Sequence, residues 1–358
     1  MKILYVITGL GQGGAERVVC DLADKMFEKG NDVKIAYLTG DVLTKPKCDE
    51  IEVIQINMKS TLSLPKAFFK LSKVIKSYNP NVVHTHMVHA NLLTRLVRLV
   101  VPMHKLISTA HNSNEGGRGR MLTYRITHNL ADVTTNVSET AVASFEKNHA
   151  VPKNRMRRVY NGVNFNGFTY DSFAKEKITK ELNLEKEKKI ILAVGRFNEQ
   201  KNYPNLLKAI RRLKEQSTVD FILLVAGDGE LRSDIEELII ELNLSNEVVL
   251  LGRRNDVPIL MSACDLFVLS SDYEGLPTVL IEALACQSHV VSTEVSGVLE
   301  IIGEHGCIVP VNDFHALSQA IEKSLTNNNK NILGSERVKD KFDLDTVSDE
   351  WLEIYYET

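Results

Sequence analysis

The sequence predicts an α/β protein made of two domains in tandem, each with a parallel sheet covered by helices. The chain has 358 residues, enough to build two hydrophobic cores. Short apolar runs alternate with helical patterns through both halves, as expected for βαβ units. Each half opens with an apolar strand that runs into a glycine-containing loop, at Gly9 and at Gly195. These features are typical of Rossmann-like domains, whose ligands bind at the carboxyl ends of the strands.

The expected strands follow from short apolar runs bounded by turn residues. In the first half they are Ile3–Ile7, Val33–Leu38, Val53–Ile56, Val82–His84, Lys105–Ser108 and Val133–Val137. In the second half they are Ile190–Val194, Phe221–Ala226, Val248–Leu251, Leu266–Leu269 and His289–Ser292. The seam lies near Asn161–Asn164, which predicts domains at residues 1–164 and 165–344 and a C-terminal helix at 345–358. That helix carries Trp351, the only tryptophan, and its spacing leaves open which domain it packs on.

Composition excludes several classes of protein. Apolar and charged residues occur at ordinary globular levels, and five cysteines are scattered without CxxC spacing, which favours a reducing cytosol over a disulfide framework. The opening run Met1–Ile7 is short and β-branched, so we interpret it as a strand and not a signal peptide. No stretch approaches the length needed to span a bilayer.

The two halves carry opposite charge. Residues 1–165 contain 23 basic and 13 acidic residues, a net charge of +10, and the remainder has −13. A basic half predicts a partner that bears phosphate or a membrane surface. The expected helices at 65–79 and 91–102 are amphipathic and basic, with Arg95 and Arg98 in the second. They suit either contact with anionic lipid or simple packing on the sheet.

Two glutamates eight residues apart follow the buried run that ends at Ser271. Glu274 falls in the strand-to-helix loop, and Glu282 in the helix that Pro277 is expected to begin. The amides of that junction favour an anion such as phosphate, and a carboxylate there can hold sugar hydroxyls. The alternative is a solvated helix with two surface glutamates.

A second strand-to-helix junction is basic. Gly195 and Arg196 follow a strand, and Lys201 precedes the next helix. A guanidinium fork and an ammonium together suit a diphosphate. The alternative is a surface loop with incidental charge.

The first half offers glycines and histidines. Gly9, Gly11 and Gly14 match a dinucleotide-binding pattern, but the second strand lacks the acidic residue at its end that this pattern requires. A loop that admits a phosphate to backbone amides is the better interpretation. His84, His86 and His111 lack the carboxylate spacing of a metal site. The Asp343-Leu344-Asp345 motif is placed to cap the last helix.

The second half resembles the donor site of the retaining GT-B glycosyltransferases, in the large family numbered four. The resemblance rests on ordered motifs: strand Val248–Leu251, Gly252-Arg253, Asp256-Val257-Pro258, Ala263-Cys264-Asp265 and the stretch Tyr273–Glu282. It covers nearly the full length of the chain, with the first-half loop Gly13-Gly14-Ala15-Glu16 on the acceptor side. The family's fold is α/β, with two Rossmann-like domains that face each other across a deep cleft and a last helix that crosses back to the first domain.

The resemblance also implies roles for residues. His111 and Glu274 take the catalytic positions, His111 for orientation and charge stabilisation and Glu274 as a ligand of the donor sugar. Donor-binding positions are Gly195, Arg196, Lys201, Arg253, Gly275, Leu276, Pro277, Thr278 and Glu282. Gly13 and Gly14 form the acceptor or phosphate loop. His86 either lines the acceptor side or is a strand-end histidine bonded to backbone, the latter being favoured.

The implied reaction is transfer of a sugar, with N-acetylgalactosamine as one candidate, from a UDP-linked donor to a polyprenyl-diphosphate-linked acceptor. It needs no metal or cofactor and serves lipopolysaccharide or O-antigen type assembly. The expected place is the cytoplasm, at the anionic inner face of the cytoplasmic membrane, with no nucleic-acid partner. The alternatives are a sugar-nucleotide epimerase or a nucleotide-sugar-binding module without catalysis.

Overall fold

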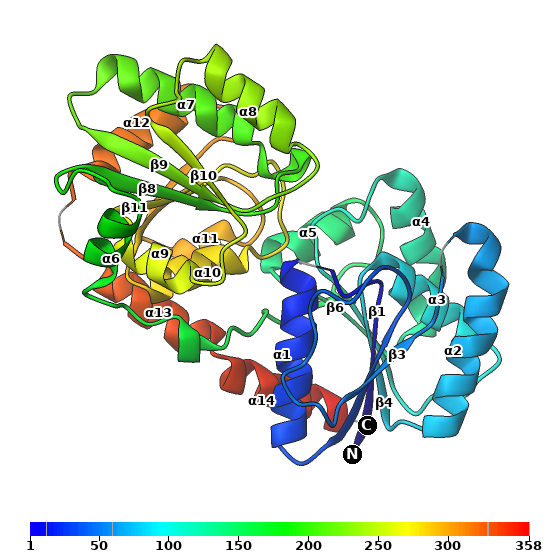
Figure 1. Ribbon diagram of the computed structural model, residues 1–358. Helices are drawn as coiled ribbons and strands as arrows, with labels where there is room; N and C mark the ends of the chain where they lie inside the picture. Colours follow the sequence, from blue (N-terminus) through cyan, green and yellow to red (C-terminus); the bar gives the residue numbers. More distant parts are fainter. Residues whose placement is uncertain (12, 59, 328, 358) are drawn as a thin grey trace. The chain divides into compact units, whose positions relative to one another are not determined.

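A computed structural model describes residues 1–11, 13–58, 60–327 and 329–357 of the chain. The contacts divide the chain into two compact units (Figure 1). Unit 1 comprises Met1–Val163 together with Phe342–Thr358, and unit 2 comprises Asn164–Lys341. The chain therefore leaves unit 1 once and returns to it for its last segment.

Unit 1 is built on a parallel sheet. Its strands, in the order in which they lie side by side, are β3 (Glu52–Gln55), β2 (Asp32–Tyr37), β1 (Lys2–Ile7), β4 (Val82–His86), β5 (Leu106–Ala110), β6 (Val133–Asn136) and β7 (Arg157–Arg158). The chain winds outward in one direction from β1 to β3 and in the other from β4 to β7, so the order reverses between β1 and β4. Ligands of open parallel sheets bind beside such a reversal.

Helices cover both faces of this sheet. They are α1 (Gly14–Glu28), α2 (Leu64–Tyr78), α3 (Val88–Arg98), α4 (Arg118–Thr127), α5 (Glu139–Lys147) and α14 (Leu344–Tyr356). Side chains alternate between the faces of a strand. Leu4 and Val6 pack into the core formed with α2 and α3. Tyr5 points to the other face, where it meets Tyr355 of α14.

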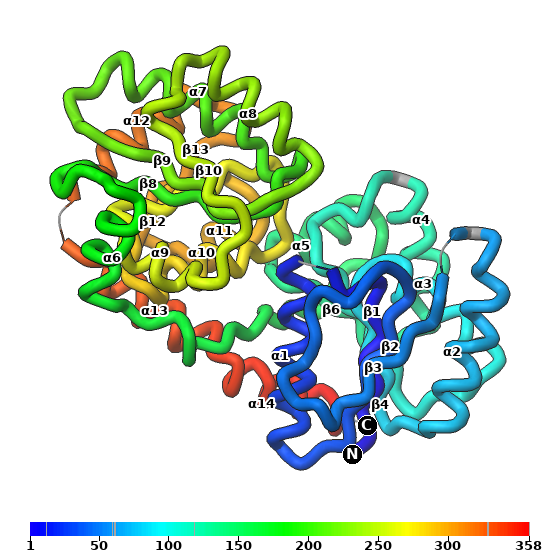
Figure 2. The backbone as a smooth tube through the Cα atoms, in the orientation of Figure 1, coloured from blue at the N-terminus to red at the C-terminus, as the bar shows by residue number. Residues whose placement is uncertain are grey.

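The C-terminal helix α14 packs on unit 1 beside α1, and both chain ends lie in this unit (Figure 2). Its Asp345 and Asp349 form ion pairs with Lys25 of α1 and with Lys29, the residue that caps the end of α1, at 2.9 and 2.6 Å. Trp351 is buried against the sheet. Of the two placements that the spacing left open, the structure has the helix on the first unit.

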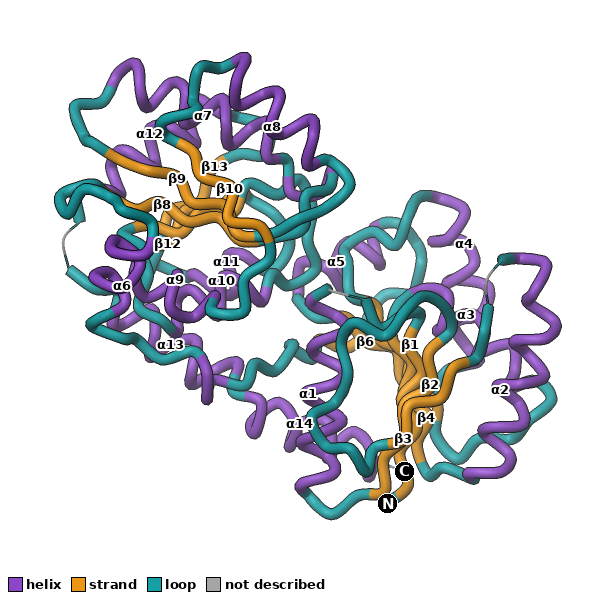
Figure 3. Tube along the Cα trace, viewed as in Figure 1, coloured by secondary structure: helices purple, strands orange, loops and turns teal. Residues whose placement is uncertain are grey.

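Unit 2 repeats the design with a six-stranded parallel sheet in the order β10 (Val248–Gly252), β9 (Phe221–Ala226), β8 (Lys189–Val194), β11 (Leu266–Leu269), β12 (His289–Thr293) and β13 (Cys307–Val309). Its helices are α6 (Ala174–Glu181), α7 (Tyr203–Gln216), α8 (Arg232–Glu241), α9 (Val257–Ala263), α10 (Thr278–Ala285), α11 (Val298–Ile302), α12 (Phe314–Leu325) and α13 (Ile332–Phe342). Helices flank the strands within each unit, as the colouring by secondary structure shows (Figure 3). The order reverses between β8 and β11.

The return of α14 changes the charge of unit 1. Residues 342–358 contribute six acidic and no basic residues, so unit 1 has 23 basic and 19 acidic residues and a net charge of +4. The +10 of the first 165 residues therefore overstates the positive charge of the folded unit.

Arg95 also departs from the expectation of a solvated basic helix face. It is fully buried and bonds to hydroxyl and carbonyl oxygens, including Ser108 and Thr127. It is not available to a membrane surface, because α3 turns this side chain toward the sheet and α4.

Candidate active site

The loops that follow β8 and β11 meet at the carboxyl edge of the unit 2 sheet. The two strands are neighbours at the reversal of strand order, so their loops leave the sheet side by side. Several hydrogen bonds join the loops. Among them are Ser270 Oγ to the Lys201 carbonyl at 2.8 Å, the Asp272 amide to the Gln200 carbonyl at 2.9 Å, and Asn202 Nδ2 to Asp272 Oδ1 at 2.6 Å. The loop that carries Lys201 and the loop that carries Glu274 are therefore bonded to each other.

The Glu274 carboxylate is the centre of this structure. Lys201 Nζ lies 2.7 Å from Oε1, Ser271 Oγ donates to the same oxygen at 2.8 Å, and Gln200 Nε2 donates to Oε2 at 2.9 Å. Glu274 is only 8% exposed, so an ion pair and two hydrogen bonds compensate its desolvation. Three donors from two loops fix the carboxylate in one orientation before any ligand arrives.

Two arginines follow strands β8 and β10 at the same edge of the sheet and remain solvated. Arg196 is 3.0 Å from Glu230, and Arg253 is 3.8 Å from Asp228. Both arginine side chains are more than 60% exposed, and exposed pairs of this kind contribute little stability. Either guanidinium can therefore turn to an anionic ligand at small cost.

The glutamate loop enters helix α10 one residue later than expected. Pro277 is the N-cap, with φ −72° and ψ 92°, and the first helical residue is Thr278. Proline's lack of an N–H is tolerated at either place. Gly275 and Leu276 pack against Gly297, where a side chain would approach the Gly275 carbonyl to 2.9 Å. Glu282 lies within α10 and is partly buried. The predicted donor residues from Gly195 to Glu282 thus all belong to unit 2.

The glycine loop of unit 1 lies at the other reversal of strand order. It joins β1 to α1, with Gly13 as N-cap at φ −138° and Gly14 as the first helical residue. The first amides of a helix have no partner within the helix itself, so the start of α1 at this edge favours an anion. His86 ends the neighbouring strand β4.

The three histidines form a row on adjacent strands of unit 1. The rings of His84 and His86 lie 4.1 Å apart, and His86 Nδ1 is 2.9 Å from His111 Nε2. His84 is bonded on both nitrogens, to Tyr355 Oη and Thr109 Oγ1, each at 2.7 Å. The expectation that His86 bonds to backbone was wrong, because its ring turns toward the neighbouring strand and meets His111.

Burial keeps this row of imidazoles neutral. It lowers the pKa of His111 to about 4 and holds the pKa of His84 and His86 well below the usual value, with repulsion from the other protonated rings adding to the shift of the latter two. At neutral pH each ring therefore carries one N–H and one lone pair. The row offers hydrogen bonds to a ligand but no resident charge.

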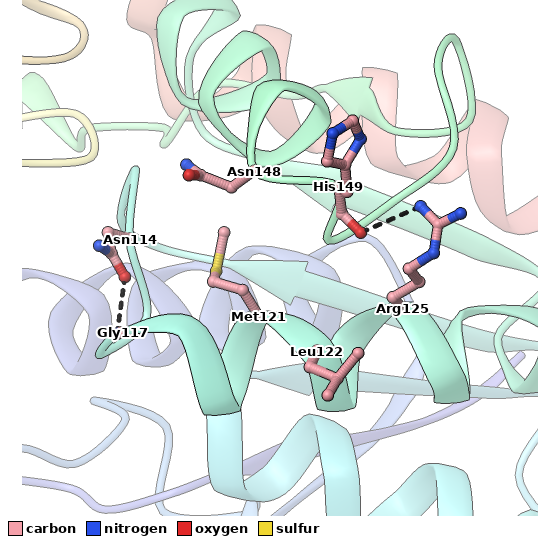
Figure 4. A pocket seen from close by; sticks show the side chains of 7 residues that line it. All are labelled: Asn114, Gly117, Met121, Leu122, Arg125, Asn148 and His149. Atoms are coloured by element: carbon pink, nitrogen blue, oxygen red, sulfur yellow. Dashed lines mark hydrogen bonds between the residues drawn. The ribbon is translucent and has the colours of Figure 1, made fainter.

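A hollow of about 400 Å³ lies elsewhere in unit 1, between α4 and the end of α5 (Figure 4). It is lined by Asn114, Gly117, Met121, Leu122, Arg125, Asn148 and His149. Asn114 Oδ1 accepts from the Gly117 amide, and Arg125 donates to the His149 carbonyl at 3.3 Å. None of the predicted site residues lines it. We place the functional sites at the reversals of strand order, where charged and polar groups converge.

Sequence reasoning missed several residues that hold these sites. Gln200 and Ser271 bind Glu274, and Tyr355 binds His84. Gln200 and Ser271 flank the motifs that pointed to the site, which was the available signal. Nothing in the sequence connects Tyr355 to a histidine 271 positions away.

Family models match both units. Residues 12–166 match the model described as Glycosyltransferase Family 4, and residues 174–337 match Glycosyl transferases group 1. The two matches are consecutive and together cover most of the chain.

Individual proteins agree with these models. An N-acetylgalactosamine-N,N'-diacetylbacillosaminyl-diphospho-undecaprenol 4-alpha-N-acetylgalactosaminyltransferase of Campylobacter jejuni is 26% identical over 90% of each chain. A second transferase of that organism, which bears the name GalNAc-alpha-(1->4)-GalNAc-alpha-(1->3)-diNAcBac-PP-undecaprenol alpha-1,4-N-acetyl-D-galactosaminyltransferase, is 26% identical over 100% of this chain and 99% of its own. The structure of Anabaena HepE in complex with UDP and glucose superimposes with a TM-score of 0.85 at 18% identity, covering 99% of both chains. The chain therefore belongs to the GT-B glycosyltransferases, with a family 4 domain followed by a group 1 domain.

Proposed function

We propose that this protein is a retaining glycosyltransferase that moves a sugar from a UDP-linked donor to a polyprenyl-diphosphate-linked saccharide during surface-polysaccharide assembly. The observation that carries the proposal is the Lys201–Glu274 pair at the strand reversal of unit 2. A cation for the diphosphate and a carboxylate for sugar hydroxyls are the two groups that a sugar nucleotide requires. Here they stand 2.7 Å apart on loops that hydrogen bonds lock together.

Each donor residue has a physical role in this proposal. Lys201 and the solvated Arg196 neutralise the diphosphate, and the amides of Gly275 and Leu276 with the start of α10 at Thr278 add positive potential. Glu274 orients the donor sugar, and Glu282 holds the ribose diol. The loop at Gly252-Arg253 passes beside the base, and Gly195 and Pro277 shape the two loops.

In unit 1, the proposal assigns His111 to the donor sugar and its leaving diphosphate. A neutral imidazole there donates or accepts a hydrogen bond without competing with Lys201 for the diphosphate charge. Gly13 and Gly14 present amides to the acceptor phosphate.

The choice of donor and acceptor follows the relatives. Both Campylobacter transferases are named for adding N-acetylgalactosamine to saccharides on undecaprenyl diphosphate, and they match nearly the whole chain. HepE, which has the same fold, holds UDP and glucose. We therefore favour UDP-N-acetylgalactosamine, with another UDP-hexose or hexosamine as the next candidate.

We propose that transfer needs no metal or further cofactor. The Asp343-Leu344-Asp345 motif is used by the fold, since Asp343 caps α14 by accepting from the Asp345 amide at 2.8 Å and Asp345 pairs with Lys25. The charge that develops on the leaving diphosphate is balanced by Arg196, Lys201 and the start of α10.

We propose that unit 1 binds the anionic inner face of the cytoplasmic membrane. In the described residues, no helix has the length and hydropathy of a membrane span. Large apolar side chains are exposed on the segments around α2, α3 and α4, namely Leu62, Phe69, Leu99, Val100, Leu122 and Ile126. Lys66, Lys73 and Lys76 of α2 are exposed as well, and together these residues suit a lipid interface.

The test is a transfer assay with UDP-N-acetylgalactosamine and an undecaprenyl-diphosphate disaccharide, followed by NMR of the new glycosidic bond. We expect an α-linked product with and without EDTA, and a loss of about 10³-fold in Glu274→Gln. The matched control Glu237→Gln, at an exposed glutamate of α8, stays within about threefold of the parent.

Two results would contradict this function: a β-linked product would exclude retention, and UDP binding without transfer to any acceptor would favour a binding module. Vesicles of anionic and neutral lipid test the membrane surface in the same assay. Phe69→Ser with Leu99→Ser should reduce binding to anionic vesicles, whereas Leu299→Ser, equally exposed but on unit 2, should not. Equal binding of all variants to anionic vesicles would contradict the proposal that unit 1 binds the membrane.

A further inference from the structure

His86 and His111 form a hydrogen-bonded pair of buried imidazoles. His86 is the last residue of β4, and His111 directly follows β5, the next strand of the sheet. The His86 Nδ1 to His111 Nε2 distance is 2.9 Å, with ring centroids 5.2 Å apart. The contact joins the carboxyl ends of two strands beside the reversal of strand order in unit 1.

This contact couples the tautomers of the two rings. Both are neutral at neutral pH, and a neutral imidazole has one donor and one acceptor nitrogen. One ring must donate and the other must accept, so the proton positions on His86 and His111 are coupled. The nitrogen of a histidine that carries the proton is commonly set by the hydrogen bond at its other nitrogen.

The outer nitrogens of the pair are left without partners. Within the described residues, His86 Nε2 and His111 Nδ1 are buried and make no hydrogen bond. A buried polar atom without a partner is unfavourable, and a ligand that supplies a hydrogen bond can relieve this cost. His111 therefore has one ring nitrogen held by the protein and one buried ring nitrogen that lacks a partner among the described residues.

The ring of His86 is itself held in place. It packs against the His84 ring, with centroids 4.1 Å apart and the planes tilted by 35°. His84 is fixed in turn by hydrogen bonds to Tyr355 and Thr109 and by the Trp351 ring at 4.4 Å. Two residues of the C-terminal helix therefore fix His84, and His84 in turn limits the position of the His86 ring. On the other side, the His111 amide donates to Glu115 Oε1 at 3.1 Å, which fixes the backbone of His111.

We infer that His86 is a positioning residue for His111. It occupies the Nε2 edge of His111, sets the tautomer of that ring, and leaves the Nδ1 edge to face the sugar nucleotide. The inference rests on the proposed function in its last step, because only there does His111 touch the donor. The coupling of the two rings stands on the geometry alone.

Two substitutions separate the hydrogen bond of His86 from its packing. His86→Phe keeps a ring on His84 but removes the hydrogen bond, whereas His86→Asn places an amide close to the position of Nδ1 without the ring. His128→Leu is the control, since His128 is a buried histidine of unit 1 outside the row. Melting curves verify that each variant folds.

The expected kinetic result is a split between turnover and binding. In His86→Phe we expect kcat to fall about 100-fold, because a catalytic group that is out of place by about 1 Å loses that much. The KM for the UDP-sugar should stay within about threefold. His86→Asn should retain at least about ten times the kcat of His86→Phe, and His128→Leu should resemble the parent protein. If His86→Phe kept its kcat and His86→Asn lost it, the inference would be overturned. That result would mean that His86 contributes the packing of its ring and not its hydrogen bond to His111.

Nitrogen-15 NMR of the imidazoles tests the coupling without any transfer. We expect the parent protein to show one tautomer of His111, and His86→Phe to shift or mix its two nitrogen signals. Unchanged His111 signals in His86→Phe would overturn the inference even if activity fell. If the signals change but the parent protein transfers no sugar, the proposed function fails and the positioning of His111 stands.

Discussion

The two units place polar side chains at the same point of the same kind of sheet, yet they stabilise them in opposite ways. In unit 2, Lys201 and Glu274 keep their charges and satisfy each other across two loops. In unit 1, His86 and His111 lie at strand ends and His84 lies within β4 against Trp351 of α14; burial holds all three neutral. Loops can bring two opposite charges into contact. A buried strand, by contrast, favours titratable groups such as histidine that become neutral when they lose a proton.

The first prediction tests whether packing dominates in unit 1. Trp351→Ala should lower the free energy of unfolding by about 3–5 kcal/mol, as for other buried aromatic truncations. Tyr356→Ala, on the exposed side of the same helix, should change it by less than about 0.5 kcal/mol. Calorimetry of the full chain measures both. A small effect at Trp351 would mean that the ion pairs of α14, and not its packing, hold the row.

The second prediction tests whether charge pairing dominates in unit 2. Lys201→Met should destabilise the protein by about 2–3 kcal/mol, because it leaves the Glu274 carboxylate desolvated and unpaired. Adding Glu274→Leu should restore most of that loss while UDP-sugar binding remains absent. Urea denaturation and nucleotide titration measure the two properties.

The control for that pair is Arg196→Met, which breaks the exposed pair with Glu230 and should change stability by less than about 0.5 kcal/mol. If Lys201→Met with Glu274→Leu were as unstable as Lys201→Met alone, the ion pair would not be the main contribution of these two side chains to stability.

The third prediction concerns pH and should show the smallest effect. The row histidines have lower pKa values in the folded state than the usual 6.5, so the unfolded chain binds more protons just below pH 6.5. Their contribution to stability is therefore full above pH 6.5 and is lost as the pH falls toward about 4, where His111 also protonates in the fold.

The melting temperature should accordingly drop between pH 7.5 and 5.5, and His86→Asn should weaken that dependence by up to one proton, about 1.4 kcal/mol per pH unit. Glu115 beside His111 has a raised pKa from burial and acts in the opposite direction at lower pH. An equal slope in His86→Asn and in the exposed His104→Gln control would contradict the prediction.

The fold could be predicted because its signals are local. Each expected strand is present, and the fold class is confirmed. Strands β7 and β13 were missed, since two or three residues are too few for a period. The start of α10 was misplaced by one residue because proline is compatible with both positions.

The site was predictable only in part. Lys201 and Glu274 stand in recognisable loops, but their contact depends on β8 and β11 being neighbours, which no local pattern encodes. The partner of His86 was missed for the same reason, because it is supplied by the next strand of the sheet. Arg95 was expected on a solvated basic helix face but is fully buried. Helical spacing alone does not show how much of a basic side chain the neighbouring helix covers.

The return of the last helix to unit 1 has a consequence for biosynthesis. A ribosome completes unit 2 at Lys341, before it has made α14, so the second unit in sequence is the first to be whole. Until α14 has been made, Tyr5 and His84 lack the Trp351 and Tyr355 rings that cover them. The nascent first unit therefore exposes an apolar and aromatic surface for the whole time that unit 2 is being translated, which makes it a natural client for chaperones.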